Sequence, residues 1–402
     1  MTEFIRGKKG AVCVFVTMIL STMLLAVTVI GNAAFARLKW AEADAAFRIG
    51  ARSVLGEYDI RLKNDYGIFA YKASADRVES KIENYAEVNM NGSFKPFNAE
   101  QIEVNAENME YSLLETEKLK KQLTEAGELA MLTGPKGKKR EKPCDAVKYM
   151  VNQTTIKTLP SQGKNLKMIN LSGLSAESLS LSALAQSAGD SFLENKYIIS
   201  TFKNRFREIP SRKSFFEYEA EYILTGKTSE AASLKKVKKL LFAFRDPLNT
   251  AHIMADPAKM AEAAAYAASI PTPGEPVETA VIVALWSACE SENDVKLLLE
   301  GKNVAVVKTR AQWALTLEEA VGSLFSAIPK NPPEKSGQSY EDYLNALLFF
   351  EDEDTKLIRV LDLIQMNLRG SYNENFLVKD FFTGLAFSAK ADGKDYFYEE
   401  VY

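Results

Sequence analysis

Side chains suited to acid–base or nucleophilic chemistry are sparse in this chain. It contains a single histidine, His252, and the adjoining residues 249–251 match no nucleophile or general-base motif. One histidine, with no C-x-x-C pair and no H-E-x-x-H sequence, also lacks the ligand spacing of a zinc site. We therefore expect no metal site, no catalytic residue and a structural role for His252.

Gly226-Lys227-Thr228 has the ending of a phosphate-binding loop. Such a loop also needs a glycine five residues before Gly226, so that backbone N–H groups can surround the phosphates. That position holds Glu221, whose negative charge would lie where a phosphate should bind. The sequence thus predicts neither nucleotide binding nor any cofactor.

Carboxylates occur in pairs, notably Glu341-Asp342 and the run Glu351–Asp354. A glycosidase needs two carboxylates that face each other across a cleft, whereas adjacent residues on a helix point in different directions. The acidic run also lacks the ligand spacing of a calcium loop. We interpret both as helix surface or solvated loop, and an exported carboxylate hydrolase is the third of three functional hypotheses.

Two basic stretches, Lys136–Lys142 and Lys235–Lys239, are candidate binding surfaces. Around the second, four apolar residues share one helix face, so its lysines are expected on the solvent side: Leu234, Val237, Leu241 and Phe244. The first is expected to be a flexible loop, with contact to anionic wall polymers or lipid headgroups as the alternative. A formal net charge of −3 gives no support for nucleic-acid binding.

Composition is that of an ordinary globular protein, with 402 residues, 47% hydrophobic and 26% charged. Only three cysteines are present, and Cys13 lies in a long apolar run. Whether Cys144 and Cys289 pair is left open by the sequence.

An uncharged run of 27 residues, 10–36, begins nine residues into the chain. A helix of that length would be about 40 Å long, which is enough to cross a hydrocarbon core of about 30 Å. Arg6, Lys8 and Lys9 precede the run and favour a cytoplasmic N-terminus, although Arg37 and Lys39 follow it and weaken that preference. We expect a single-pass protein of the cell membrane whose bulk lies outside the cytoplasm.

A cleaved signal peptide is the alternative, because Ala34-Phe35-Ala36 has a small-x-small form. The apolar run exceeds a signal-peptide core, however, and the helical pattern continues past it. Seven apolar residues recur there at intervals of three and four: Trp40, Ala43, Phe47, Ala51, Val54, Tyr58 and Leu62. This apolar stripe predicts one long helix that extends beyond the membrane.

The predicted fold class is α+β, helix-dominant, with a long N-terminal transmembrane helix, small β elements and a C-terminal hairpin. Its regions are a cytoplasmic tip (1–9), a transmembrane helix (10–36), a membrane-proximal helical or α+β region (37–132), a loop or linker (133–189) and an exported α+β domain (190–402).

Local patterns predict the individual elements of this fold. Helices are expected from the span to Gly67 and over Ala75–Val88 and Leu113–Leu132, and strands over Gln101–Ser112 and Ser214–Leu224. An apolar stretch at Val304–Lys308 should interrupt the helical pattern that starts near Asp190. Proline clusters at 271–276 and 329–333 should separate helices. At the C-terminus, Asp392-Gly393 suits a tight turn between two strands, Phe381–Ala389 and Tyr396–Tyr402.

A short basic tip, an uncharged span and an amphipathic continuation form the layout of pilin-like proteins. The chain resembles single-pass proteins encoded in tight-adherence (Tad/Flp) pilus loci of Gram-positive, clostridia-like bacteria, with a TadE/TadG-like pseudopilin layout. The resemblance rests on these segments: Lys9-Gly10, Ser53-Val54-Leu55, Glu57-Tyr58-Asp59, Tyr66-Gly67-Ile68-Phe69, Glu219–Lys227, Trp286 with Glu290, Asp294, Leu298 and Gly301, Ser339–Leu344, and Asp362–Gln365 with Asn367.

The resemblance implies a non-enzymatic, membrane-anchored, pseudopilin-like component of pilus or secretion-system assembly. Its partners would be membrane lipid and other Tad or pilus subunits or pseudopilins, with neither nucleic acid nor nucleotide. The apolar stripe is then either an assembly surface or a contact with the chain's own domain. In the first case, Phe47→Glu with Val54→Glu should block assembly while the exported part still folds.

Gly10 is the candidate site for a prepilin peptidase. Pilins cleaved by that enzyme usually carry a glutamate five residues after the cut, but the corresponding residue here is Phe15, and the span contains no glutamate. A retained minor component or assembly factor therefore fits better than a processed subunit. The alternative function is an anchored cell-wall-associated binding or sensor protein.

Overall fold

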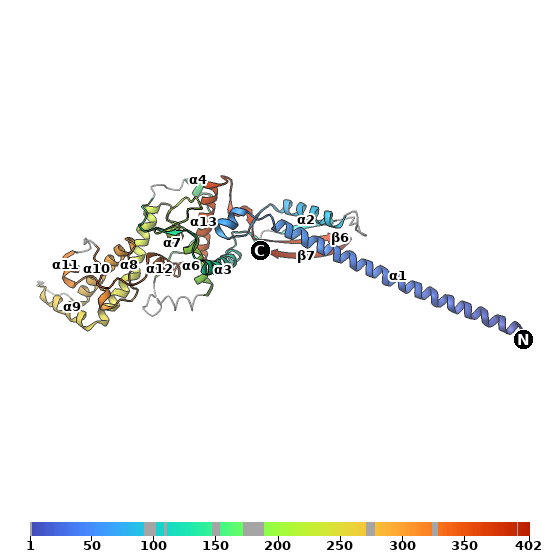
Figure 1. Cartoon of the computed structure of the whole chain (residues 1–402), viewed down its shortest axis with the longest axis horizontal. Coiled ribbons are helices and arrows are strands. Elements are labelled where there is room, and N and C mark those ends of the chain that lie inside the picture. Colours follow the sequence, from blue (N-terminus) through green and yellow to red (C-terminus); the bar gives the residue numbers. More distant parts are fainter. Residues whose placement is uncertain are drawn as a thin grey trace. The chain divides into compact units, whose positions relative to one another are not determined.

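The computed structural model describes residues 2–91, 102–107, 111–146, 153–171, 189–270, 278–323, 329–391 and 393–402 (Figure 1). The chain forms two compact units, and both are discontinuous in sequence. Unit 1 comprises Met1–Asp59, Ala70–Ser112 and Phe382–Tyr402, and unit 2 comprises Ile60–Phe69 and Leu113–Phe381.

Unit 1 consists of two helices on one face of a small antiparallel sheet. Its elements are α1 (Thr2–Leu55), β1 (Tyr71–Lys72), α2 (Ala75–Met90), β2 (Ile102–Glu107), β6 (Gly384–Ala391) and β7 (Lys394–Val401). The strand order is β2-β6-β7, with Val104 opposite Ala389 and Ala389 opposite Tyr396. The C-terminal hairpin thus pairs with a strand from the first third of the chain.

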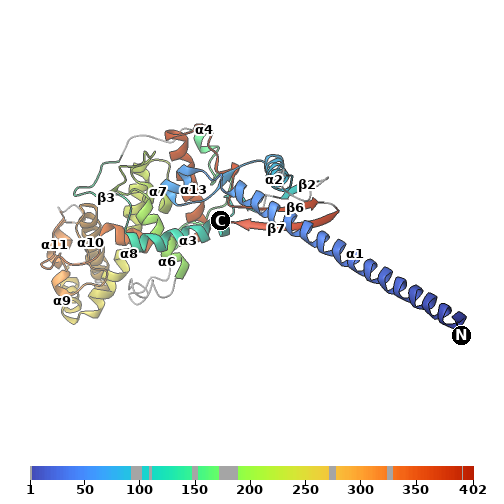
Figure 2. The same cartoon turned by 45° about the vertical axis from the view of Figure 1, so that its right-hand side comes forward.

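The core of unit 1 lies between this sheet and the helices. Val104, Leu385 and Phe387 point from the sheet into a cluster with Phe47 of α1 and Ile82 of α2. In Figures 1 and 2, the C-terminal part of α1 lies beside the β6–β7 hairpin, and its N-terminal part extends beyond the sheet. Alternation of apolar and polar residues explains why each strand buries only one face.

Unit 2 is mainly helical. Its helices are α3 (Thr116–Thr133), α4 (Gln153–Ile156), α6 (Gly189–Thr201), α7 (Glu219–Thr225), α8 (Glu230–Ala255), α9 (Pro257–Ser269), α10 (Thr279–Leu299), α11 (Leu317–Ser323), α12 (Tyr340–Leu348) and α13 (Glu353–Ser371). Short elements complete it: η1 (Leu62–Tyr66), η3 (Arg310–Gln312), η4 (Val378–Asp380), β3 (Lys138–Lys139) and β4 (Arg207–Glu208), with β5 (Phe381–Phe382) where the chain passes into unit 1.

α13 is the central helix of unit 2, since every residue from Thr355 to Leu368 is buried. A helix that is buried on all sides must place its polar groups against partners. Asp362 accepts a hydrogen bond from the Tyr222 hydroxyl at 2.8 Å, and Asn367 contacts the Tyr66 hydroxyl at 3.1 Å.

Several predictions about the fold are confirmed. The chain is helix-dominant α+β, with a long N-terminal apolar helix, small sheets and C-terminal strands. α2 and β2 lie where their periodicity predicts, and the proline cluster at 329–333 falls between α11 and α12. The cluster at 271–276 lies outside the described residues. Gly67 has φ 73° and ends η1, as expected of a glycine at a helix C-terminus. Asp392, in the predicted hairpin turn, lies outside the described residues.

Other predictions differ from the structure. α1 ends at Leu55, before a turn at Gly56, so the predicted single helix to Gly67 is wrong. The predicted strand at Ser214–Leu224 contains α7 instead. The apolar stretch Val304–Lys308 does lie between helices, and Val304 forms an isolated bridge with Gln338.

The predicted domain boundaries at 132/133 and 189/190 also differ from the two units. Hydrogen bonding between β2 and β6 joins the C-terminal hairpin to the membrane-proximal region. Such a pairing between distant segments leaves no local trace in the sequence.

Candidate functional site

The N-terminal part of α1 is apolar on every side. Of the described helices, α1 alone is long and apolar enough to cross a membrane, with a mean hydropathy of 2.5 in a window that the protein leaves entirely unburied. Its large apolar side chains from Val12 to Ile30 are 44–69% exposed. Because exposing apolar area to water costs about 25 cal/mol per Å², this segment is suited to lipid.

Hydroxyl groups in this segment bond to the helix itself. Thr17 donates to the carbonyl oxygen of Cys13 at 3.0 Å, and Thr28 donates to that of Leu25 at 2.8 Å. A polar group in hydrocarbon is costly unless it is paired, so these bonds make the hydroxyls compatible with a membrane.

The apolar stripe packs against the chain's own sheet. Phe47, Ala51 and Val54 are at most 1% exposed and belong to the core of unit 1. The Phe47 ring lies 5.5 Å from that of Tyr396 and 6.1 Å from that of Tyr398. For these three residues, the expected assembly surface is wrong, because the sheet already covers them.

The other stripe residues do not extend that surface. Trp40 is 41% exposed, and the Lys394 amine lies 4.6 Å from its ring. Tyr58 and Leu62 follow the end of α1, and Leu62 is buried in unit 2. Gly10 lies within α1, where an added Cβ would meet no atom within 4 Å.

The opposite side of α1 forms a different surface, which we call the outer ridge. The outer ridge consists of four exposed residues that lie three or four positions apart: Ala41, Ala45, Ile49 and Arg52. The Ile49 side chain is 48% exposed. This spacing puts them on one helix face, turned away from Phe47 and Val54. The sequence analysis missed this ridge, because its apolar content is too low to stand out as a stripe.

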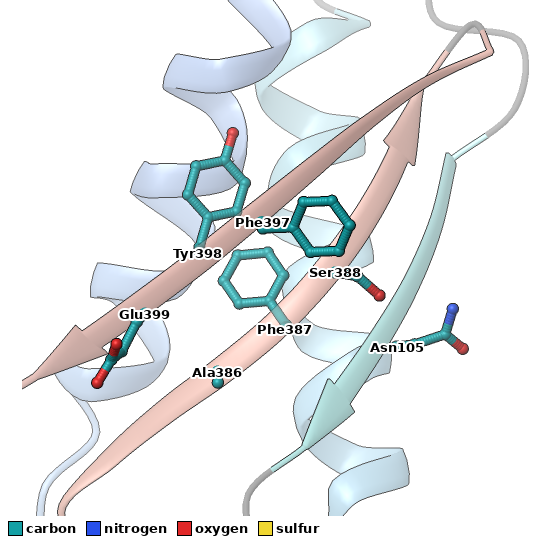
Figure 3. A pocket seen from close by; sticks show the side chains of 7 residues that line it. All are labelled: Asn105, Ala386, Phe387, Ser388, Phe397, Tyr398 and Glu399. Atoms are coloured by element: carbon teal, nitrogen blue, oxygen red, sulfur yellow. The ribbon is translucent and has the colours of Figure 1, made fainter.

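The open face of the unit 1 sheet carries a hollow of about 370 Å³. Five of its lining residues alternate with the core residues of the strands and face away from α1: Asn105, Ala386, Ser388, Phe397 and Glu399. Figure 3 shows them on β2, β6 and β7, with the Phe397 ring over the sheet. Phe397 is 79% exposed, which is high for an aromatic side chain. We call this feature the sheet hollow.

In unit 2, the charged residues of α10 form a buried ionic cluster. The Lys308 amine donates to Glu290 and lies 2.7 Å from Asp294. Arg245 donates to Asp294 at 3.0 Å, and Glu290 also accepts the backbone N–H of Ala314. Burial alone would raise the pKa of Asp294, but the adjacent positive charges of Lys308 and Arg245 lower it below its usual value. Burial raises the pKa of Glu290.

His252 lies beside this cluster in an aromatic setting. Its ring stacks on Trp313 at 5.0 Å, and burial followed by the charge of Lys259 lowers the pKa of His252. Lys259 lies 4.2 Å from the Trp286 ring and 4.0 Å from the Trp313 ring, at the edge of a hollow of about 280 Å³. Burial lowers the pKa of Lys259 to about 8. His252 therefore packs on an aromatic ring, as a structural residue does.

The other residues with candidate chemistry have structural positions. Gly226 has φ 64° and ends α7, while Glu221 is buried and accepts the backbone N–H of Arg205 at 3.0 Å. Glu341 pairs with Arg207 at 2.7 Å. The expectation of a solvated acidic run is wrong for Glu351, which is buried and whose pKa burial raises to about 7.

The two basic stretches differ in structure. At Lys235–Lys239, Val237 is buried while most of the lysines are exposed, as predicted. The stretch Lys136–Lys142 is not only a loop, since β3 within it pairs with β4. Cys144 and Cys289 are both free thiols, which settles the pairing that the sequence left open. Among the described residues, no three His, Cys, Asp or Glu side chains converge as metal ligands do.

A further hollow in unit 2, of about 230 Å³, has a cationic lining. Arg61, Arg212 and Lys213 face Asp65 there. Arg212 is 6% exposed and donates to Glu219, but its Nε and Nη1 atoms have no hydrogen-bond partner. We call this feature the cationic hollow.

Residues 120–393 match a protein family described as a family of unknown function (DUF5702). No curated protein and no solved structure matches the chain. The family match begins within α3, includes the part of unit 2 that follows it in sequence and ends just after β6, so it leaves out α1. Because it covers more than half of the chain, this protein belongs to the DUF5702 family.

Proposed function

We propose that this protein is a non-enzymatic, membrane-anchored, pseudopilin-like component of a tight-adherence (Flp-type) pilus or related secretion system. One observation carries the proposal: α1 is a continuous helix of 54 residues that is apolar and unburied at one end and packed on an antiparallel sheet at the other. A helix of this kind links a lipid-embedded segment to a folded domain without a flexible joint.

Charge distribution supports the direction of insertion. Three basic residues precede the span and two, Arg37 and Lys39, follow it closely, so the basic bias favours a cytoplasmic N-terminus and two exported units. The buried charges of unit 2 also support a non-enzymatic role. Glu290, Asp294, Lys308 and Arg245 pair with one another inside the core, where they hold α10 against α8.

Cell fractionation of the native host tests this function. With a C-terminal tag, full-length protein is expected in the membrane fraction, accessible to external protease and co-purifying with proteins of the pilus locus. A band shortened at Gly10 in sheared filaments would identify a processed pilin instead. A band shortened at Ala36 and released into the medium would identify a signal peptide and overturn the proposal.

The cationic hollow supports the alternative, an anchored cell-wall-associated binding or sensor protein. Arg61 and Lys213, beside the buried Arg212, would attract the phosphate groups of an anionic wall polymer. Protein that sediments with purified cell wall in low salt but not in high salt would favour this function. Arg61→Glu with Lys213→Glu should then abolish sedimentation, whereas Lys238→Glu, on exposed α8 surface, should not.

A further inference from the structure

The outer ridge and the sheet hollow match each other in chemistry. Ile49 is an exposed, branched apolar side chain, and the sheet hollow presents the exposed Phe397 ring and Ala386. A single exposed isoleucine needs no partner, so the ridge alone would indicate nothing. The same unit, however, also contains a hollow that the ridge matches.

Charge supports the match. On the open sheet face, Lys390 lies between Glu103 and Asp395 in the strand register, and Glu399 is an exposed acidic residue that lines the hollow. On the outer ridge, Arg52 is exposed one helical turn from Ile49. An isoleucine with a neighbouring arginine is thus complementary to the Phe397 ring with a neighbouring glutamate, in a hollow that Asn105 and Ser388 also line.

The arrangement within unit 1 prevents the outer ridge of a chain from filling the sheet hollow of that same chain. The outer ridge and the sheet hollow lie on opposite outer sides of a layer in which α1 covers the inner face of the sheet. A ridge can therefore fill only the hollow of another copy. Contacts between two different surfaces repeat without closing and generate open chains of subunits.

We infer that copies of this chain associate head to tail, with Ile49 of one copy in the sheet hollow of the next and Arg52 beside Glu399. This inference rests on the proposed assembly function and names its partner, a second copy. Stacking α1 on the sheet of the next copy keeps all α1 helices parallel, as their insertion in one membrane requires. The contact differs from the apolar stripe, which each copy uses for its own core.

Cysteine cross-linking between two differently tagged full-length copies in native membranes tests this contact. Cys13 and Cys144 are first replaced by serine, and Cys289 remains because it is buried. Oxidation should join an Ile49→Cys chain to a Ser388→Cys chain. The control, a Leu132→Cys chain, is 86% exposed on α3 and should not cross-link to Ser388→Cys.

Charge exchange supplies the second measurement. Arg52→Glu and Glu399→Arg should each reduce the cross-linked fraction by about three- to tenfold, because like charges meet across the contact. The combination of both changes in one chain should restore it. All variants should resist protease as the unaltered chain does, because both side chains are exposed.

Three results would overturn the inference: no cross-link between Ile49→Cys and Ser388→Cys, no rescue by the combined charge exchange, or a preferred Ile49–Ile49 cross-link. The last would mean a symmetric helix dimer. In each case, co-purification with pilus-locus proteins would still support the proposed function. Failure of that function would instead appear as release of the chain from the membrane.

Discussion

At the residue scale, this protein places ionisable groups where they stabilise the fold. Asp294 receives hydrogen bonds from Arg245, Asn249 and Lys308, all of them buried. A buried charge is tolerated only when its partners replace the water that it has lost. The spacing of Glu290 and Asp294 on α10 is therefore a packing requirement of unit 2.

Removal of the buried Lys308 ammonium group should lower the stability of the fold. Lys308→Met leaves Glu290 and Asp294 without that cation, and it should lower the free energy of unfolding by about 3–5 kcal/mol. Lys302→Met is the control, since Lys302 has a 41% exposed side chain and pairs with Glu300 at 2.7 Å. It should cost about 0–1 kcal/mol. Urea unfolding of the full-length protein in detergent measures both free energies. Equal losses for Lys308→Met and Lys302→Met would contradict a stabilising role for the buried ionic cluster.

Glu221 should make stability depend on pH. Burial raises its pKa from 4.5 to about 7, so between these values the folded state holds a proton that the unfolded state releases. The free energy of unfolding contributed by Glu221 is thus complete below pH 4.5 and declines as the pH rises to 7. Glu221→Gln should reduce this decline by about 2 kcal/mol. Unfolding curves of the unaltered chain and of Glu221→Gln at pH 5 and pH 8 test this prediction. An equal loss of unfolding free energy in the two proteins between these pH values would contradict it.

At the element scale, α1 carries out two tasks along its length. Its N-terminal part is suited to lipid, and its C-terminal part buries one face on the sheet and exposes the other. The change occurs without a kink or break before Leu55. The side of α1 available for assembly is consequently the outer ridge, opposite the apolar stripe.

Charge placed on the two faces of α1 should therefore have different effects. Phe47→Glu with Val54→Glu buries two carboxylates in the core of unit 1 and should unfold it, at a cost above about 3 kcal/mol. Ile49→Glu lies on the exposed face and should leave the fold intact. Limited proteolysis of full-length protein distinguishes them. A folded, protease-resistant double variant would show that the sheet does not depend on this contact.

At the scale of the whole molecule, one chain forms two compact units. Unit 1 contains the membrane-suited helix and the sheet, while most of the family match lies in unit 2. The proposed assembly contacts lie in unit 1, and the cationic hollow of the alternative function lies in unit 2. Variants in each unit therefore test the two functions separately.

The proposed orientation has a direct test. In intact cells freed of their wall, external protease should remove a C-terminal tag and leave an N-terminal tag protected. Detergent should expose both tags, which controls for protease activity. Protection of the C-terminal tag would place both units in the cytoplasm and contradict an exported protein.

Local pattern was sufficient for much of unit 1. The uncharged run, the spacing of the apolar stripe and the alternation in β2 and β7 each act over a few residues, so the sequence predicts these elements directly. Local pattern gave the wrong element at Ser214–Leu224, where the aromatic residues are typical of a strand. There, Glu219 and Glu221 accept the backbone N–H groups of Lys203 and Arg205, and α7 forms around these buried bonds.

By itself, the sequence determined the helix-dominant α+β class, the apolar helix and the hairpin, because periodicity and turn chemistry are local properties. Only the tertiary structure decided what the apolar stripe contacts. A stripe records that a face is buried, not whether its partner belongs to the same chain. Pairing of β2 with β6 brings the sheet under Phe47 and Val54, and it leaves Ile49 and Phe397 on the outside.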